Sequence, residues 1–171
     1  MIDEKAAQAM KTAIEMEKSG HQFFSDAAGQ VKHEVGRKLF SRLAAEELVH
    51  LQIFSKIFSA LAEGADWRKA VASVEPARRV PYFDEARTEF KAANPTVELD
   101  YLRKALELER KAIAFFGKAI METGSPEARE VFTQILEQEQ GHYDLIQAEV
   151  ESISGSGFWF DVRESYMDGK Y

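Results

Sequence analysis

The amino-acid sequence predicts an all-α protein, a four-helix bundle in which two helical hairpins are joined by a long crossover. Apolar residues recur at helical spacing over four long stretches. Only 4 prolines and 10 glycines interrupt the 171 residues, and three of the prolines fall in one segment, residues 63–95, that shows no sustained period. A chain of this length is expected to form one domain with a substantial core.

The first hairpin is predicted from residues 3–31 and 34–62. Both stretches carry an apolar stripe with the period of an α-helix, and an acidic residue interrupts each stripe, Glu17 in the first and Glu47 in the second. His50 follows Glu47 by one turn on the same face. Because a buried carboxylate destabilises an apolar interior unless it has a partner, these interruptions indicate a functional site.

The second hairpin is predicted from residues 94–123 and 125–153. Asn94-Pro95-Thr96 is typical of a helix start, with proline early in the first turn. Gly124-Ser125-Pro126-Glu127 indicates a helix end followed by a helix start. Glycine ends helices, serine caps them, proline suits the first helical position, and an acid faces the positive helix end.

The remaining segments are a crossover and a tail. Residues 63–95 are predicted to connect the hairpins, with one short helix at Tyr82–Ala92. The bundle then covers residues 1–153, and residues 154–171 form a C-terminal tail. The tail contains Phe158-Trp159-Phe160, which we expect to pack on the bundle or on a partner subunit, because such an apolar run does not easily stay exposed.

The composition excludes several kinds of function. The absence of cysteine excludes disulfides, zinc–thiolate sites, iron–sulfur clusters and thiol catalysis. A formal net charge of −7, with no basic face or tail, argues against nucleic-acid binding. There is no membrane-spanning run of about 18 apolar residues, and the first residues show no hydrophobic signal segment. We therefore expect a cytoplasmic protein with no nucleic-acid or membrane partner.

A set of glutamate and histidine residues occurs twice in the chain at one fixed offset. Glu17 is followed 30 residues later by Glu47 and, three residues further on, by His50. Adding 92 to each number returns residues of the same type, which are Glu109, Glu139 and His142. One turn past the first glutamate of each set lies a small residue, Gly20 or Ala112, which leaves room beside the carboxylate.

Other acidic residues fit the repeat less well. Glu46 is also placed to act with the histidine one turn later, but its counterpart is Gln138, so we assign the ligand role to Glu47. Glu15 and Glu107 do repeat, but they lie on a different helical face from the predicted ligands. We expect these two side chains to be solvated.

The duplicated set matches a dimetal carboxylate centre. In di-iron and di-manganese bundles, two helices each supply one glutamate and the other two each supply a Glu-x-x-His pair. Four carboxylates offset two divalent cations, whereas without metal they would repel one another and be costly to bury. The predicted metal ligands, through which any catalysis would run, are Glu17, Glu47, His50, Glu109, Glu139 and His142.

The chain resembles the rubrerythrin branch of the ferritin-like superfamily over roughly residues 3–153. The motifs that carry the resemblance are Glu17-x-x-Gly20-x-x-Phe23-Phe24, Glu47-x-x-His50, Glu109-x-x-Ala112-x-x-Phe115-Phe116 and Glu139-x-x-His142. The resemblance implies a ferritin-like bundle that holds two metal ions, with iron as the first choice and manganese or zinc as alternatives. It also implies that Glu47 and Glu139 bridge the ions. The remaining ligands would be Glu17 with His50 for one ion, and Glu109 with His142 for the other.

The resemblance implies a redox function as well. Rubrerythrins reduce peroxide at a di-iron centre, and relatives oxidise ferrous iron or store it. We therefore expect an oxidoreductase of peroxidase or ferroxidase type that reacts with peroxide or dioxygen, and a homodimer by family analogy. Two alternatives are an iron-binding, storage or ferroxidase protein without peroxidase turnover, and a metal-stabilised helical interaction module.

The chain departs from the rubrerythrin pattern in three respects. Rubrerythrins typically carry a Cys-rich rubredoxin-like domain, but this chain has no cysteine, so we expect a separate electron-donor protein. Ala112 stands where rubrerythrin has an extra glutamate that exchanges with a histidine, which leaves a symmetric site with six ligands. Phe24 and Phe116 stand where the family often has tyrosine.

Three further polar residues are predicted to be structural. His21 and His33 have no counterparts under the offset and are expected on the surface or in a connection. Tyr101 lies two turns before Glu109 on its helical face, and we expect it to pack in the core rather than to act at the site.

Overall fold

The computed structural model describes residues 3–72, 74 and 95–154. The described residues form helices and no strand, which confirms the predicted all-α fold class. The helices are α1 (Glu4–Gln30), α2 (Glu34–Ala62), α3 (Trp67–Val71), α5 (Pro95–Glu122) and α6 (Pro126–Ser154). The short helix predicted at Tyr82–Ala92 and the apolar run Phe158-Trp159-Phe160 lie outside the described residues.

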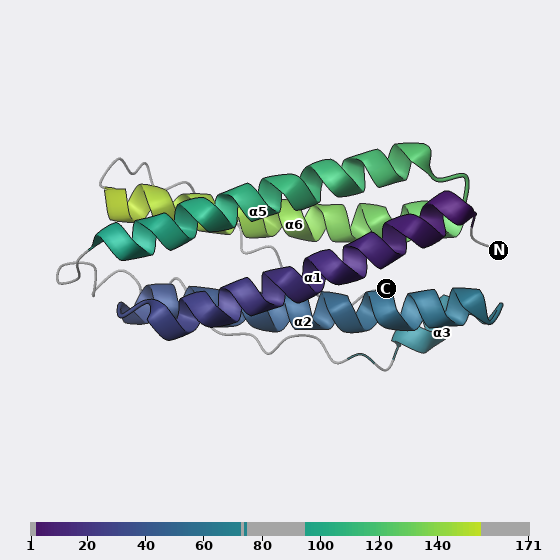
Figure 1. Ribbon diagram of the computed structural model, residues 1–171, viewed down its shortest axis with the longest axis horizontal. Helices are drawn as coiled ribbons and strands as arrows, with labels where there is room; N and C mark the ends of the chain where they lie inside the picture. The colour runs from purple at the N-terminus through teal and green to yellow at the C-terminus, as the bar shows by residue number, and fades with distance from the viewer. Residues whose placement is uncertain (1–2, 73, 75–94, 155–171) are drawn as a thin grey trace.

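Two helical hairpins form the bundle. α1 packs along α2 and α5 packs along α6, while α1 also contacts α5 and α2 contacts α6 (Figure 1). α2 ends at one end of the bundle and α5 begins at the other (Figure 1). The second hairpin therefore begins at the opposite end of the bundle from the point where α2 ends, and this is the arrangement that bundles with a long crossover connection have.

Local signals explain where the long helices begin. Asp3 caps α1, because its Oδ1 accepts a hydrogen bond from the Ala6 N–H at 2.7 Å. Its Oδ2 accepts the N–H of Gly124 at 2.6 Å, which ties the start of α1 to the turn between α5 and α6. In that turn Ser125 caps α6, as predicted, by accepting the N–H of Ala128 at 3.2 Å.

The helical periodicity does not predict α3, which has 5 residues. Asp66 caps this helix by accepting the N–H of Arg68 at 3.1 Å. Trp67 is buried and joins the apolar core beside α2. A single turn of helix is too short to show a period in the sequence, so α3 depends on its cap and on the burial of one tryptophan.

Two apolar clusters fill the bundle on either side of a layer of buried glutamates and histidines. Phe24 and Phe40 stack in one cluster with their ring centroids 6.3 Å apart. Phe116 and Phe132 lie 6.1 Å apart in the other cluster. The offset of 92 residues relates these two pairs, so the repeat in the sequence is also a repeat in packing around the polar layer.

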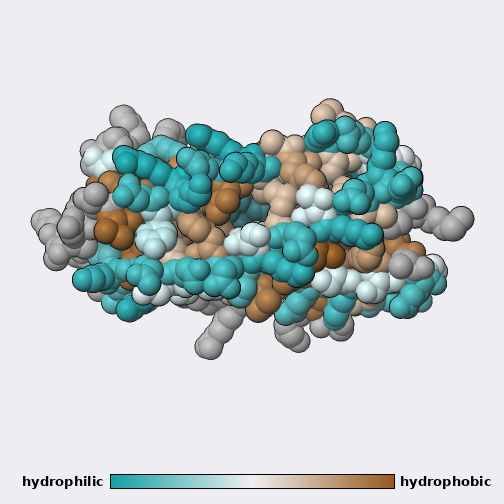
Figure 2. Space-filling view, viewed as in Figure 1, coloured by the Kyte–Doolittle hydropathy of each residue, from teal (hydrophilic) through white to brown (hydrophobic). Residues whose placement is uncertain are grey.

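The outside of the bundle is largely hydrophilic. Figure 2 shows hydrophilic side chains along the helices of one face, with apolar side chains between them. The large apolar residues that are exposed in the described part of the chain are Leu48, Val97 and Met121, which are far apart in the sequence. None of the described helices combines the length and the apolar character needed to cross a lipid bilayer.

Candidate metal centre

The structure brings the six residues of the repeated set together in the middle of the bundle. Glu17 projects from α1 and Glu109 from α5, while α2 and α6 each supply a Glu-x-x-His pair. The spacing of three residues places both members of a pair on one helical face. Each of the six residues is at most 4% exposed.

The six residues form two overlapping groups of donor atoms. The first group is Glu17, Glu47, His50 and Glu139, and the second is Glu47, Glu109, Glu139 and His142. Within each group, one donor atom from every residue lies within 4.8 Å of the others. A metal ion with bonds of about 2.1 Å holds its ligand atoms roughly 3–4.2 Å apart, so each group is close to the size that one ion requires. Two glutamates, Glu47 and Glu139, belong to both groups.

The two histidines turn the same ring nitrogen toward the carboxylates. His50 Nδ1 lies 3.3 Å from Glu139 and 3.4 Å from Glu17. His142 Nδ1 faces three carboxylates, which are Glu47 at 3.2 Å, Glu139 at 3.6 Å and Glu109 at 3.8 Å. The rings are nearly parallel, with an interplanar angle of 15° and centroids 5.5 Å apart. The two imidazoles thus present equivalent atoms to a shared set of carboxylates.

The histidine Nδ1 atoms and carboxylate oxygens that face the middle of the bundle are better placed to bind metal ions than to form hydrogen bonds with one another. Although the distances are short, Nδ1 of both histidines and one oxygen each of Glu17, Glu47 and Glu139 are buried without a hydrogen bond of proper geometry. Buried polar atoms without hydrogen bonds cost free energy and need an explanation. Metal ligation provides one, because an imidazole lone pair and a carboxylate oxygen both donate to cations.

A comparison with known families agrees with this geometry. Residues 8–150 match the family described as Rubrerythrin, and they make up most of the 171-residue chain. The chain belongs to the rubrerythrin family. No match was found among curated proteins or among solved structures. The resemblance inferred from the repeated glutamates and histidines is therefore confirmed at the level of the rubrerythrin family.

Two glutamates of this rubrerythrin site hold protons unusually tightly in the metal-free protein. Burial raises the pKa of Glu17 well above its usual range, and the charges of Glu47 and Glu139 raise it further. Burial also raises the pKa of Glu109, with the charge of Glu139 adding to the shift. The cause in both cases is a carboxyl group removed from water and placed among like charges.

The histidines also hold protons tightly, for a different reason. Burial alone would lower the pKa of His50, but its contacts with Glu139 and Glu17 outweigh burial and raise that pKa well above the usual value. Contacts with Glu139 and Glu46 do the same for His142. Burial would raise the pKa of Glu139, but its contacts with both histidines lower it. Protons thus offset part of the carboxylate charge when no metal is bound, and metal ions would displace them.

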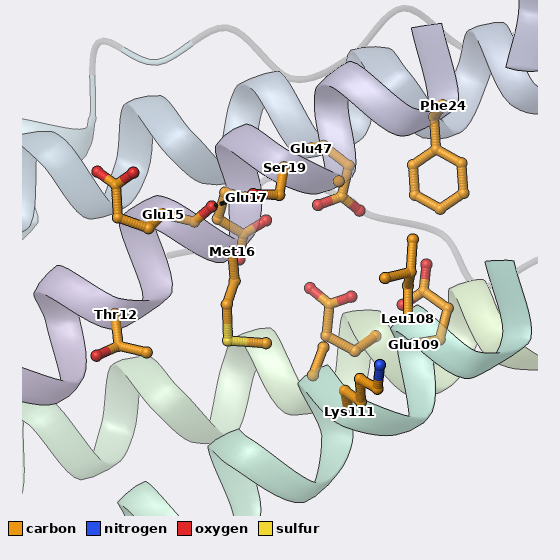
Figure 3. Close-up of a pocket in the computed structure, with 13 residues that line it drawn as sticks. Thr12, Glu15, Met16, Glu17, Ser19, Phe24, Glu47, Leu108, Glu109 and Lys111 are labelled. Atoms are coloured by element: carbon orange, nitrogen blue, oxygen red, sulfur yellow. Dashed lines mark hydrogen bonds between the residues drawn. The ribbon is translucent and has the colours of Figure 1, made fainter. Parts of the chain in front are cut away.

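A cavity of about 330 Å³ gives access to the carboxylates from between α1 and α5 (Figure 3). Its lining includes all four repeated glutamates, which are Glu17, Glu47, Glu109 and Glu139, and neither histidine of the two pairs. In Figure 3, Glu17 and Glu47 from one hairpin and Glu109 from the other are directed into the same space. Gly20 and Ala112 also line it. A small molecule that enters here meets the carboxylate side of the centre.

The polar residues that were not predicted as ligands belong to neither donor group. Glu15 and Glu107 are exposed and pair with lysines of their own helices. Tyr101 packs against two phenylalanine rings, with centroid distances of 6.1 and 6.3 Å. His33 is the N-cap residue of α2, in a connection as expected. His21 is half-buried rather than on the surface, and its Nδ1 lies 2.7 Å from a carbonyl oxygen of α2.

Glu46 is a site residue that the comparison of the two halves set aside. It belongs to neither donor group, yet it is buried and its Oε2 lies 3.0 Å from Nε2 of His142. Burial would raise the pKa of Glu46, but its contacts with His142 and Arg42 lower it to about 2. The sequence contains one sign of this residue, an arginine four positions earlier on the same helix, but it does not show the histidine partner on α6.

Proposed function

We propose that this chain binds two metal ions, with iron as the first choice, in the middle of its bundle and uses them for redox chemistry with peroxide or dioxygen. The observation that carries the proposal is the pair of overlapping donor groups that share Glu47 and Glu139. Membership of the rubrerythrin family supports it independently. Carboxylate and imidazole ligands also suit manganese and zinc, so iron is proposed on family grounds.

The proposed ligand arrangement follows the two donor groups. Glu47 and Glu139, which are common to both groups, would bridge the ions. The other ligands would be Glu17 with His50 for one ion, and Glu109 with His142 for the other. Four carboxylates would offset the charge of two divalent cations in an otherwise apolar interior. As ferrous ions the metals would supply two electrons, which with two protons convert one hydrogen peroxide into two water molecules.

The protein would supply a buried site for the two metal ions and a cavity through which a small oxidant can reach it. The four long helices hold the carboxylates and imidazoles in place, so little rearrangement is needed when an ion binds. The cavity between α1 and α5 is large enough for a small oxidant and adjoins the carboxylates rather than the histidines. The 171 residues include no cysteine, so we propose that electrons arrive from a separate redox protein.

The test is to load the purified chain with ferrous iron under anaerobic conditions, and to measure metal content and the rate of oxidation by peroxide. We expect about two iron ions per chain and oxidant consumption that requires them. Glu47→Ala removes a ligand common to both groups, so iron content should fall below about one per chain and oxidation should slow by about tenfold or more. The matched control is Glu107→Ala, which alters an exposed glutamate of α5 and should change neither quantity.

The outcomes separate the proposal from its alternatives. Unchanged iron content and oxidation rate in Glu47→Ala would contradict it. Iron accumulation far above two ions per chain would indicate storage. Full stabilisation by zinc, together with no consumption of peroxide or dioxygen by the iron-loaded protein, would indicate a metal-stabilised interaction module.

A further inference from the structure

Among the residues that the structure describes, a buried carboxylate lies behind one of the two site histidines and not behind the other. Glu46, which is 6% exposed, precedes the proposed bridging ligand Glu47 on α2 and faces the other ring nitrogen of the same histidine, His142. Its Oε2 lies 3.0 Å from Nε2 of His142 on α6. Its Oε1 accepts a hydrogen bond from Nε of Arg42 at 2.9 Å, so the carboxylate is held from both sides.

The contact uses the nitrogen of His142 that is turned away from the donor groups. Nδ1 of this histidine faces the carboxylates, and Nε2 faces Glu46. A carboxylate on the outer nitrogen of a metal-ligating histidine fixes the ring orientation and makes the inner nitrogen a stronger donor. Glu46 is therefore placed to strengthen ligation by His142.

The other histidine has a different environment. Nδ1 of His50 faces Glu139 and Glu17, but among the described residues no carboxylate lies at ion-pair distance from its buried Nε2. The offset of 92 residues places Gln138 at the position equivalent to Glu46. A charged residue in one half thus corresponds to a neutral one in the other, although the six ligands themselves are symmetric.

We infer that Glu46 is a positioning residue which makes the two metal positions inequivalent, so that the ion on the His142 side binds more tightly and fills first. The inference rests on the proposed dimetal centre. It assigns the tighter position to the donor group formed by Glu47, Glu109, Glu139 and His142. The weaker position is the group that contains His50.

The experiment is a titration of the metal-free protein with Co²⁺, followed by the visible absorption of the bound ion, which needs no redox turnover. The wild-type chain should bind two ions in separate steps. Glu46→Gln keeps the shape of the side chain but loses its charge, and should weaken the tighter step by about 10- to 100-fold. Gln138→Glu is the reciprocal variant and should strengthen the weaker step. The double variant should exchange the order in which the two positions fill.

The possible results distinguish a failure of the inference about Glu46 from a failure of the proposed dimetal function. Two equal steps in the wild-type chain, or a tighter step unchanged in Glu46→Gln, would overturn the inference and leave the dimetal centre intact. Failure of the wild-type chain to bind Co²⁺ or ferrous iron would overturn the proposed function itself. If Glu46 only stabilised the fold, Glu46→Gln would lower the Tm of the metal-free protein and leave both binding steps unchanged, which would also contradict the inference. If that variant does not fold, a weaker step unchanged in Gln138→Glu contradicts the inference.

Discussion

At the scale of single residues, Gly20 leaves space that one of the repeated carboxylates occupies. A Cβ atom added there would lie 3.0 Å from Oε2 of Glu47 and 3.3 Å from its carboxyl carbon. Glu47 comes from the neighbouring helix, so the space left by Gly20 is used by a carboxylate of α2 and not by Glu17 of its own helix. The equivalent residue in the other half is Ala112, which already carries a Cβ.

Gly20→Ala is expected to weaken metal binding more than it changes the stability of the metal-free fold. Alanine favours an α-helix over glycine by about 1 kcal/mol, and the close contact with Glu47 opposes this gain, so the Tm of the metal-free protein should rise less than in Gly117→Ala. The new methyl group would displace the Glu47 carboxylate, and we expect the affinity for Co²⁺ to fall by about tenfold. The control is Gly117→Ala on α5, where an added Cβ meets nothing within 4 Å. Equal Co²⁺ affinities in the two variants would show that Gly20 does not shape the site.

The six residues that meet at the site were predictable because each keeps its type under one offset. Glu46 was not, because a comparison of two halves discards a residue that differs between them. Its partner His142 lies on another helix, and only the fold brings the two together. The same holds for Gly20, whose small size was predictable from the repeat but whose contact with Glu47 was not. Contacts between helices are the part of the site that the sequence does not show.

At the scale of whole helices, the turn before α6 fixes the position of two of the predicted ligands. Ser125 is 4% exposed, and its Oγ accepts the N–H of Ala128 at 3.2 Å and donates to the carboxylate of Glu127 at 2.9 Å. Glu139 and His142 project from the same helix more than three turns later. The cap therefore sets where the helix begins without contacting the site.

Ser125→Ala is expected to lower stability without changing metal binding. Loss of an N-cap serine costs about 1 kcal/mol, so the Tm should fall by roughly 2–4 °C for a chain of this size. Thermal unfolding by circular dichroism measures this change, and the Co²⁺ titration should give the wild-type result. Thr133→Ala, which removes an exposed hydroxyl from the middle of the same helix, should show no such loss of Tm. A Tm of Ser125→Ala equal to that of the wild-type chain would argue against the cap.

The long helices were predictable at this scale because their start and stop signals coincide with the apolar period. α2 begins and ends at the predicted residues, Glu34 and Ala62, and the other three long helices begin within a few residues of the predicted positions. α3 escaped prediction because its single turn has no period and its main anchor, the burial of Trp67, depends on the fold. Long helices can thus be predicted from the apolar period of the sequence, whereas a helix of one turn cannot.

At the scale of the whole molecule, the polar layer makes the stability of the metal-free bundle depend on pH. The pKa values of Glu17, Glu109, His50 and His142 are raised in the folded protein. A group whose pKa is raised in the folded protein contributes its full stabilisation below its ordinary pKa, which is 4.5 for the glutamates and 6.5 for the histidines. This stabilisation is lost as the pH rises through the pKa that the group has in the folded protein. Glu139 has a lowered pKa, so its contribution is present above 4.5 and is lost as the pH falls.

The metal-free protein should therefore be most stable in mildly acidic solution and lose stability as the pH rises above about 6.5. Metal ions bind the deprotonated ligands and replace the protons, so the gain in Tm on adding Co²⁺ should grow with pH. Calorimetry between about pH 5 and pH 9 measures both trends. The double variant Glu17→Gln with Glu109→Gln removes two of the raised carboxyls, and its metal-free Tm should fall less steeply with pH. A metal-free wild-type Tm that stays level or rises over this range would show that the buried layer does not hold its protons tightly. The charge balance proposed for the centre would then lose its support.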